Sequence, residues 1–243
     1  MTSGARARFS SGVSLAEPAP GMPGAHWSRV AIEDLIDPSF LTREERALFD
    51  TLTTDKRRRE WLAGRRAARA VLRAVGAGAC SVLRNDEGAP RVVGPGGEAV
   101  DLAITHGQGQ AAALACRRDG PFPHVGIDWV DARDLPRLKR VVGRITDPTE
   151  KALCEGSNLA LQVAWGAREA ITKATRTGMF MFALSRVHLV GIAPDGRAKV
   201  DLEGAEVGYL KNPDGSVVVL ARVSAACRAA ANAVARGHEE APE

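Results

Sequence analysis

The chain has 243 residues, of which 45% are hydrophobic and 26% are charged, and its formal net charge is +4. This composition predicts a globular protein with room for one domain or two small lobes, and no apolar run reaches the length of a transmembrane helix. The N-terminus has no signal-peptide-like apolar run, and the widely spaced cysteines form neither CxxC pairs nor Cys/His clusters. These features favour a cytoplasmic protein with reduced, buried thiols and without a zinc site.

The first half of the chain begins with residues 1–24, which are rich in Gly, Ala, Ser and Pro, and we expect them to form a disordered tail. Thr42 and Thr54 are predicted helix N-caps, and the helix after Thr54 is expected to run to about Val75 and to end at Gly76. A Gly-rich hairpin turn is predicted at 106–109. Strands are predicted at 26–32, 81–84, 100–105 and 111–116.

The second half follows a Pro-containing link at 119–123 and begins with a predicted strand at 125–130. Helices are predicted at 134–143, from Pro148 behind an Asp147 cap, from the Ser157 cap to about Gly178, and at 225–236. Further strands are predicted at 187–192, 198–202, 206–210 and 217–223. Each half therefore carries helices followed by an antiparallel run, which predicts an α+β fold of two similar lobes that meet near residue 123. The expected division is a tail (1–24), an N-terminal lobe (25–122), a C-terminal lobe (123–225) and a C-terminal helix and tail (226–243).

Two acidic residues stand out in the second half. Trp165, Glu169 and Lys173 are spaced i, i+4 and i+8, which places them on one face of the predicted helix, although a Glu–Lys pair of this kind is also common on solvated surfaces. Asp128 lies within an otherwise apolar strand, where a buried carboxylate requires a partner. Asp128 either caps a backbone group at the strand end or shares one hard cation with Glu169.

A basic cluster marks the predicted helix after Thr54, where acidic residues are few. Such a cluster attracts phosphates, an acidic protein or nucleic acid, but no nucleic-acid-binding motif accompanies it. Its members are Lys56, Arg57, Arg58, Arg59, Arg65, Arg66, Arg69 and Arg73.

Taken in chain order, several stretches over roughly residues 26–223 resemble the motifs of the Sfp-type 4′-phosphopantetheinyl transferases. No single motif is decisive, but the family's order is kept. The matching stretches are Arg57–Trp61 with Gly64-Arg65 and Ala68-Arg69, Gly88-Ala89-Pro90, Ile104–Gly107, Gly126-Ile127-Asp128, Thr146–Glu150, and Trp165-x-x-Arg168-Glu169-Ala170-x-x-Lys173-Ala174.

The resemblance implies a pseudo-dimer of two α+β lobes with the active site at their interface. It also implies transfer of 4′-phosphopantetheine from coenzyme A to a serine of an acidic acyl or peptidyl carrier protein, with Mg²⁺ as cofactor and 3′,5′-ADP as the second product. The expected protein is a monomer that binds neither membrane nor nucleic acid. The residues that match the family's site are Asp128 and Glu169 for the metal, Glu169 and Lys173 for catalysis, and Arg57, Arg65, Thr105, His106, Arg168 and Lys173 for coenzyme A.

Three positions depart from the family's pattern. Val130 stands where the family commonly has a second metal-binding acid, and Arg168 stands where it has lysine before the catalytic glutamate. Arg168 cannot act as a general base, but it can bind phosphate. Glu87 reverses the charge of a lysine that often precedes the Gly-x-Pro turn. An alternative hypothesis is therefore a degenerate homologue that binds coenzyme A or a carrier protein without transfer.

Overall fold

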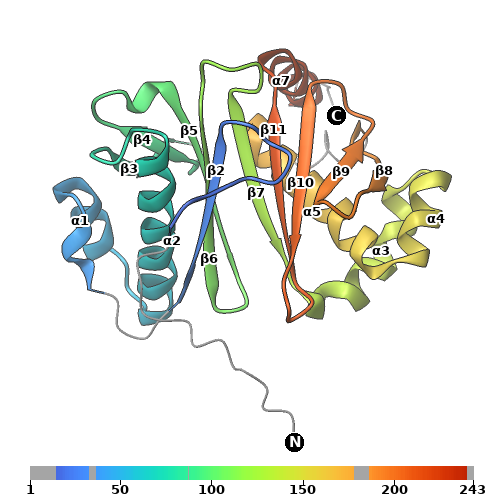
Figure 1. The fold of residues 1–243 in the computed structure, drawn as a ribbon, viewed down its shortest axis with the longest axis horizontal. Coiled ribbons are helices and arrows are strands. Elements are labelled where there is room, and N and C mark those ends of the chain that lie inside the picture. The colour runs from blue at the N-terminus through green and yellow to red at the C-terminus, as the bar shows by residue number, and fades with distance from the viewer. Residues whose placement is uncertain (1–14, 33–36, 87, 178–185, 240–243) are drawn as a thin grey trace, which may run out of the picture.

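Two antiparallel sheets lie side by side in a computed structural model that describes residues 15–32, 37–86, 88–177 and 186–239 (Figure 1). Helices α1 and α2 stand at one end of the molecule, and α3 and α4 stand at the other. The protein is therefore a two-lobed α+β fold, as the sequence predicts.

The N-terminal lobe contains a four-stranded sheet of order β1-β2-β6-β5. Helix α2 packs against this sheet, and a separate hairpin of β3 and β4 lies beside it. The bounds are β1 Glu17–Pro18, β2 Ala25–Ala31, α1 Arg43–Asp50, α2 Asp55–Ala74, β3 Ser81–Arg84, β4 Pro90–Val93, β5 Val100–Gly107 and β6 Gln110–Arg117, with 3-10 turns at Pro38–Phe40 and Gly97–Ala99.

The C-terminal lobe contains a five-stranded sheet of order β7-β11-β10-β9-β8, against which α5 packs. Both lobes thus place one long helix on an antiparallel sheet. The bounds are β7 His124–Val130, α3 Leu135–Ile145, α4 Pro148–Gly156, α5 Asn158–Thr175, β8 Leu189–Ile192, β9 Arg197–Val200, β10 Ala205–Lys211, β11 Val217–Val223 and α7 Ala225–Glu239, with a 3-10 turn at Ala132–Asp134.

The predicted caps begin the helices at the expected positions. Thr42 and Glu45 form a reciprocal capping box, and the side chain of Thr54 accepts a hydrogen bond from the Arg57 N–H. Asp147 caps α4 with Pro148 in its first turn, and Ser157 caps α5. Helix α5 ends at Thr175, earlier than predicted, and the expected terminal glycine, Gly178, lies outside the described residues.

The lobes share a buried cluster where the sheets meet. Trp27 and Leu114 come from the first sheet, and Ile127, Trp129 and Leu220 come from the second. Burial of apolar surface of this kind is the main favourable contribution to folding, so the two lobes stabilise one another. All four cysteines are buried and free, as predicted.

The predicted tail is wrong for residues 15–24. Strand β1 pairs with β2, and Ala19 and Met22 are buried in the cluster between the lobes. Local propensity gave no sign of this, because the segment is ordered by contacts with distant strands. Residues 1–14 lie outside the described part of the chain. No described helix is both long enough and apolar enough to cross a membrane.

Candidate active site

Gly126, Asp128 and Val130 alternate along β7 and point to the face that α5 covers. A Cβ atom at Gly126 would overlap the Ala170 carbonyl oxygen and would lie 2.8 Å from the Ala174 nitrogen. The backbone of α5 therefore rests directly on the backbone of β7. This close approach brings a side chain of the helix to a carboxylate of the strand.

Lys173 is that helical side chain. Its Nζ atom donates to Asp128 Oδ1 at 2.6 Å and to the Ile127 carbonyl oxygen at 3.0 Å. The Asp128 side chain is 14% exposed and that of Lys173 is 36% exposed, so the pair is partly covered. Asp128 thus has the partner that a largely buried carboxylate requires.

Glu169 lies one turn before Lys173 on the same face of α5. Burial raises the pKa of its carboxyl group, and the charge of Asp128 raises the pKa further, whereas Lys173 and Arg137 lower it. The structure therefore brings Asp128, Glu169 and Lys173 together at the junction of β7 and α5. No group of three or more acidic, histidine or cysteine side chains suited to a metal occurs among the described residues.

Arg57, Arg65 and His106 line one cavity of about 370 Å³ in the N-terminal lobe. The guanidinium of Arg65 lies over the Trp61 ring, 4.2 Å from its centroid. Burial lowers the pKa of Arg65 to about 10, although the nearby Glu45 raises it. Arg65 Nε is buried, lies 3.9 Å from Glu45 Oε1 and has no hydrogen-bond partner among the described residues.

A second cavity, of about 450 Å³, lies next to the first and is bounded on one side by Thr172 and Lys173 of α5 and by Arg176, which caps the C-terminus of that helix. The two cavities share Gly88, Pro90 and Ile104, so the basic chamber of the N-terminal lobe continues to Lys173. The remaining lining residues of the second cavity are Ala89, Leu102, Ala103 and Thr177. The cleft therefore runs between the lobes, from the basic cavity to Lys173, which pairs with Asp128.

Arg168 does not reach this cleft, and the prediction that it binds phosphate does not fit its position. Its side chain is fully buried and forms two hydrogen bonds with Glu150, Nη1 to Oε1 at 2.7 Å and Nη2 to Oε2 at 2.6 Å. Nη1 also donates to the Ala164 carbonyl oxygen, and Nη2 to that of Ile145. Arg168 therefore connects α5 to α4 and points to a different face of the helix from Glu169 and Lys173.

Neither Thr105 nor Val130 lines the basic cavity. Thr105 alternates with Ile104 and His106 along β5, so its buried side chain faces away from the basic cavity. Val130, which stands where the family commonly has a second metal-binding acid, is 3% exposed and packs in the core next to Gly166 of α5. Glu87 lies outside the described residues.

Sequence reasoning missed two residues of the cleft. Thr172 lines the cavity beside Lys173, and its Oγ1 atom is buried without a hydrogen-bond partner among the described residues. Arg176 lies three residues after Lys173 and lines the same cavity. The i, i+3 spacing from Lys173 is the signal that could have indicated Arg176.

The fold and the cleft define a class of protein, one in which two α+β lobes enclose a cleft lined by cationic side chains from both lobes. Residues 44–116 match the family model of the 4′-phosphopantetheinyl transferase N-terminal domain, and residues 124–208 match that of the 4′-phosphopantetheinyl transferase superfamily. The chain belongs to the 4′-phosphopantetheinyl transferase superfamily, as the sequence motifs predict. No curated protein matches it significantly. Family membership supports a transferase that acts on the 4′-phosphopantetheine group.

Proposed function

We propose that the protein transfers 4′-phosphopantetheine from coenzyme A to a serine of an acyl or peptidyl carrier protein and releases 3′,5′-ADP. The observation that carries this proposal is the meeting of Asp128, Glu169 and Lys173 beside a cleft whose other end is cationic. Coenzyme A has phosphates at two separate places, and the cleft has cations at two separate places. The proposed partner is an acidic carrier protein, and we expect the enzyme to act as a cytoplasmic monomer.

The basic cavity suits the 3′-phosphate of coenzyme A. Arg57 and His106 are exposed, and Arg65, which lines the same cavity, is held by stacking on Trp61. Hydrogen bonds from charged donors to phosphate are among the stronger ones in proteins. Lys173 lies where the adjoining cavity meets Asp128, so its ammonium group suits the pyrophosphate.

Asp128 and Glu169 fit Mg²⁺, since carboxylate oxygens are the protein ligands that this ion prefers and it usually keeps waters and substrate phosphates as its other ligands. When bound, Mg²⁺ would neutralise negative charge on the pyrophosphate. Glu169 would accept the serine proton, a role for which its raised pKa is suited. Lys173 would donate to a phosphate oxygen and stabilise the charge that the leaving group gains.

Mass spectrometry of an apo carrier protein incubated with the enzyme, coenzyme A and Mg²⁺ tests the proposal. We expect the carrier to gain the mass of one phosphopantetheine group. The Asp128→Asn and Glu169→Gln variants should lose transfer, whereas Glu155→Gln, which changes an exposed glutamate on α4, should keep it. Coenzyme A binding without transfer to any of several carriers would support the degenerate homologue instead.

Calorimetry of coenzyme A binding tests the cationic end separately. The Arg57→Glu variant should bind at least about tenfold more weakly, because a hydrogen bond to a charged group contributes about 1.5–3 kcal/mol. Lys56→Glu is the matched control, since Lys56 is the exposed neighbour and does not line the cavity. Arg65 is less suitable for charge reversal, because it lies against the buried Glu45. Equal affinities of the two variants would refute the assignment of Arg57.

A further inference from the structure

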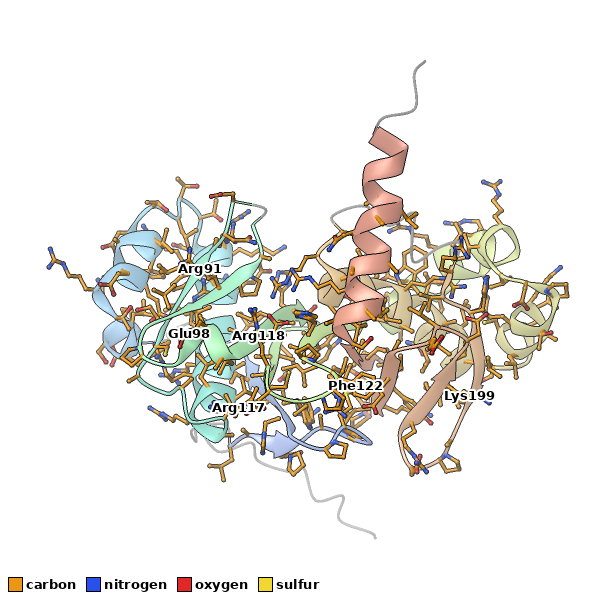
Figure 2. The ribbon with its side chains drawn as sticks, turned by 90° about the horizontal axis from the view of Figure 1, so that it is seen from above. Arg91, Glu98, Arg117, Arg118, Phe122 and Lys199 are labelled. Atoms are coloured by element: carbon orange, nitrogen blue, oxygen red, sulfur yellow. The ribbon has the colours of Figure 1, made fainter. Side chains whose placement is uncertain are left out.

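A third cavity, of about 360 Å³, lies beyond Arg176 on the side away from the basic cavity. We call it the arginine chamber, because four arginines and only two carboxylates line it. Figure 2 shows Arg91, Glu98 and Arg118 of this chamber on one side of the molecule. The charged lining residues are Arg91, Arg118, Arg176, Arg228, Glu98 and Asp101.

Asp101 lines the chamber and is a buried charge, only 1% exposed. Its Oδ1 atom accepts from Arg118 Nη2 at 2.8 Å and from Arg176 Nη2 at 3.1 Å, and its Oδ2 atom accepts from the Val125 N–H at 2.9 Å. One carboxylate thus holds two guanidinium groups, which leaves a net positive charge at this point. The side chain of Arg118 remains 42% exposed, so a ligand can reach it.

Arg228 adds to the positive charge. Its Nη1 atom lies 3.0 Å from His124 Nδ1. Burial and the charge of Arg228 lower the pKa of His124 to about 4, against the opposite effect of Asp101. His124 is therefore neutral at pH 7, and it contributes no charge to a chamber in which the arginines already exceed the acids.

The chamber continues into the cavity of Lys173, because the two share Pro90, Leu102 and Arg176. Arg176 marks the boundary and has φ of 60°, a left-handed backbone conformation that is uncommon outside glycine. Its guanidinium donates to the carbonyl oxygens of Pro90 and Leu102 as well as to Asp101. Such strain persists only where surrounding contacts enforce it, and it is concentrated at functional sites.

We propose that the arginine chamber binds the terminal carboxylate of an acyl group carried on the thiol of the coenzyme A donor. The inference rests on the proposed function, which puts the pyrophosphate at Lys173. A phosphopantetheine arm that extends from Lys173 through the second cavity passes Arg176 and reaches the arginine chamber. An acyl group with a carboxylate end adds a second negative charge beside these arginines, whereas a neutral acyl end forms no charge-assisted hydrogen bond with them.

An acylated donor undergoes the same transfer step as coenzyme A itself. The serine oxygen forms a bond to the phosphorus of the phosphopantetheine, the pyrophosphate P–O bond breaks, 3′,5′-ADP leaves and the serine proton passes to Glu169. The thioester takes no part, so the carrier protein receives the acyl group already attached. The chamber would thus select which acylated donors are used.

Calorimetry with two donors of nearly equal shape tests the chamber without requiring transfer. Succinyl-CoA ends in a carboxylate, and 4-methylpentanoyl-CoA replaces that carboxylate with a neutral isopropyl group. We expect the wild-type protein to bind succinyl-CoA about tenfold or more tightly than its neutral counterpart, because charge-assisted hydrogen bonds form only with the former. Equal affinities would overturn the proposal.

The Arg118→Gln variant should lose this preference, and Asp101 should stay paired through Arg176 and the Val125 N–H. Arg117→Gln is the matched control (Figure 2): Arg117 is the neighbouring residue, pairs with Asp119 and does not line the chamber. A preference that persists in Arg118→Gln would contradict the role of Arg118. If Arg118→Gln fails to fold, Arg91→Gln on the exposed side of β4 provides the same test.

Two further titrations distinguish an acyl carboxylate from a free anion as the ligand of the arginine chamber. Inorganic phosphate and free succinate are titrated into wild-type and Arg118→Gln proteins. Arg118-dependent binding of phosphate, together with no preference for succinyl-CoA, would identify a site for a free anion and overturn the acyl assignment. A preference for succinyl-CoA in a protein that transfers nothing would support the chamber and refute the transferase.

Discussion

Glu169 combines a partly buried carboxyl group with a second carboxylate nearby, and both raise its pKa above the ordinary value of 4.5. The folded state therefore binds this proton more readily than the unfolded state, so stability falls as the pH rises through the window between 4.5 and the raised pKa. The protein therefore still has this lower stability at neutral pH. Residues that serve chemistry often reduce stability in this way.

We expect Glu169→Gln to unfold at a higher denaturant concentration than the wild type at pH 7 and to lose transfer. The stability difference should shrink as the pH falls toward about 4, where the wild-type carboxyl group also becomes neutral. Urea unfolding across this pH range measures the difference. A variant less stable than the wild type at pH 7, with Glu155→Gln unchanged, would contradict the electrostatic account.

The buried pair of Arg168 and Glu150 is sensitive to the loss of one partner. Each single substitution to methionine should destabilise the protein by about 3–5 kcal/mol, because it removes the bidentate ion-pair partner of a fully buried charge. The double variant should recover much of this loss. Thermal unfolding of the four proteins forms a double-mutant cycle. If the destabilisation of the double variant equals the sum of those of the two single variants, the two residues act independently.

Single residues also show what sequence alone reveals. Asp128, Glu169 and Lys173 were identifiable because an acid in an apolar strand and an i, i+4 pair are local patterns. The position of Arg168 was not, since its partner Glu150 lies on another helix. Nor was the packing of Val130 on Gly166, which depends on how closely α5 approaches β7.

At the scale of elements, Gly126 sets the distance between β7 and α5. We expect Gly126→Ala to destabilise the protein by about 1–3 kcal/mol or more, since the methyl group must displace the helix backbone. Thermal unfolding measures the loss. Gly143→Ala is a suitable control, because a Cβ atom there meets no heavy atom within 4 Å. Equal unfolding temperatures of the two variants would contradict the close backbone contact.

Most helices and strands were predictable to within a few residues, because caps and apolar periodicity are encoded locally. The exceptions were β1 and β4. Strand β1 has two residues, and β4 has four and begins with Pro90, so neither carries enough alternation to be recognised. Both exist because an adjacent strand provides hydrogen-bond partners.

At the scale of the whole molecule, residues 15–24 connect the lobes. Pro18 pairs with His26 of the first sheet, Met22 is buried between the sheets, and the Pro23 carbonyl oxygen accepts from Arg222 of β11 at 2.5 Å. The N-terminal segment thus contacts both lobes. Its composition resembles that of a disordered tail, so only the three-dimensional contacts reveal this role.

We expect deletion of residues 1–24 to lower the unfolding temperature and to weaken coenzyme A binding, since the segment's contacts hold the two sides of the cleft together. Deletion of residues 1–14 is the control, because it leaves these contacts in place. Differential scanning calorimetry and titration calorimetry measure the two effects. Equal behaviour of both deletions would show that the segment does not couple the lobes.

The division of the cleft between the lobes also suits protein engineering. Arg57, Arg65 and His106 belong to one half of the chain, and Asp128, Glu169 and Lys173 belong to the other. The exposed link at Asp119–Gly120 separates the halves. Two fragments cut there, each fused to one of two interacting proteins, would hold an incomplete set of residues until those proteins meet. Labelling of a carrier tag would then report that encounter inside a cell.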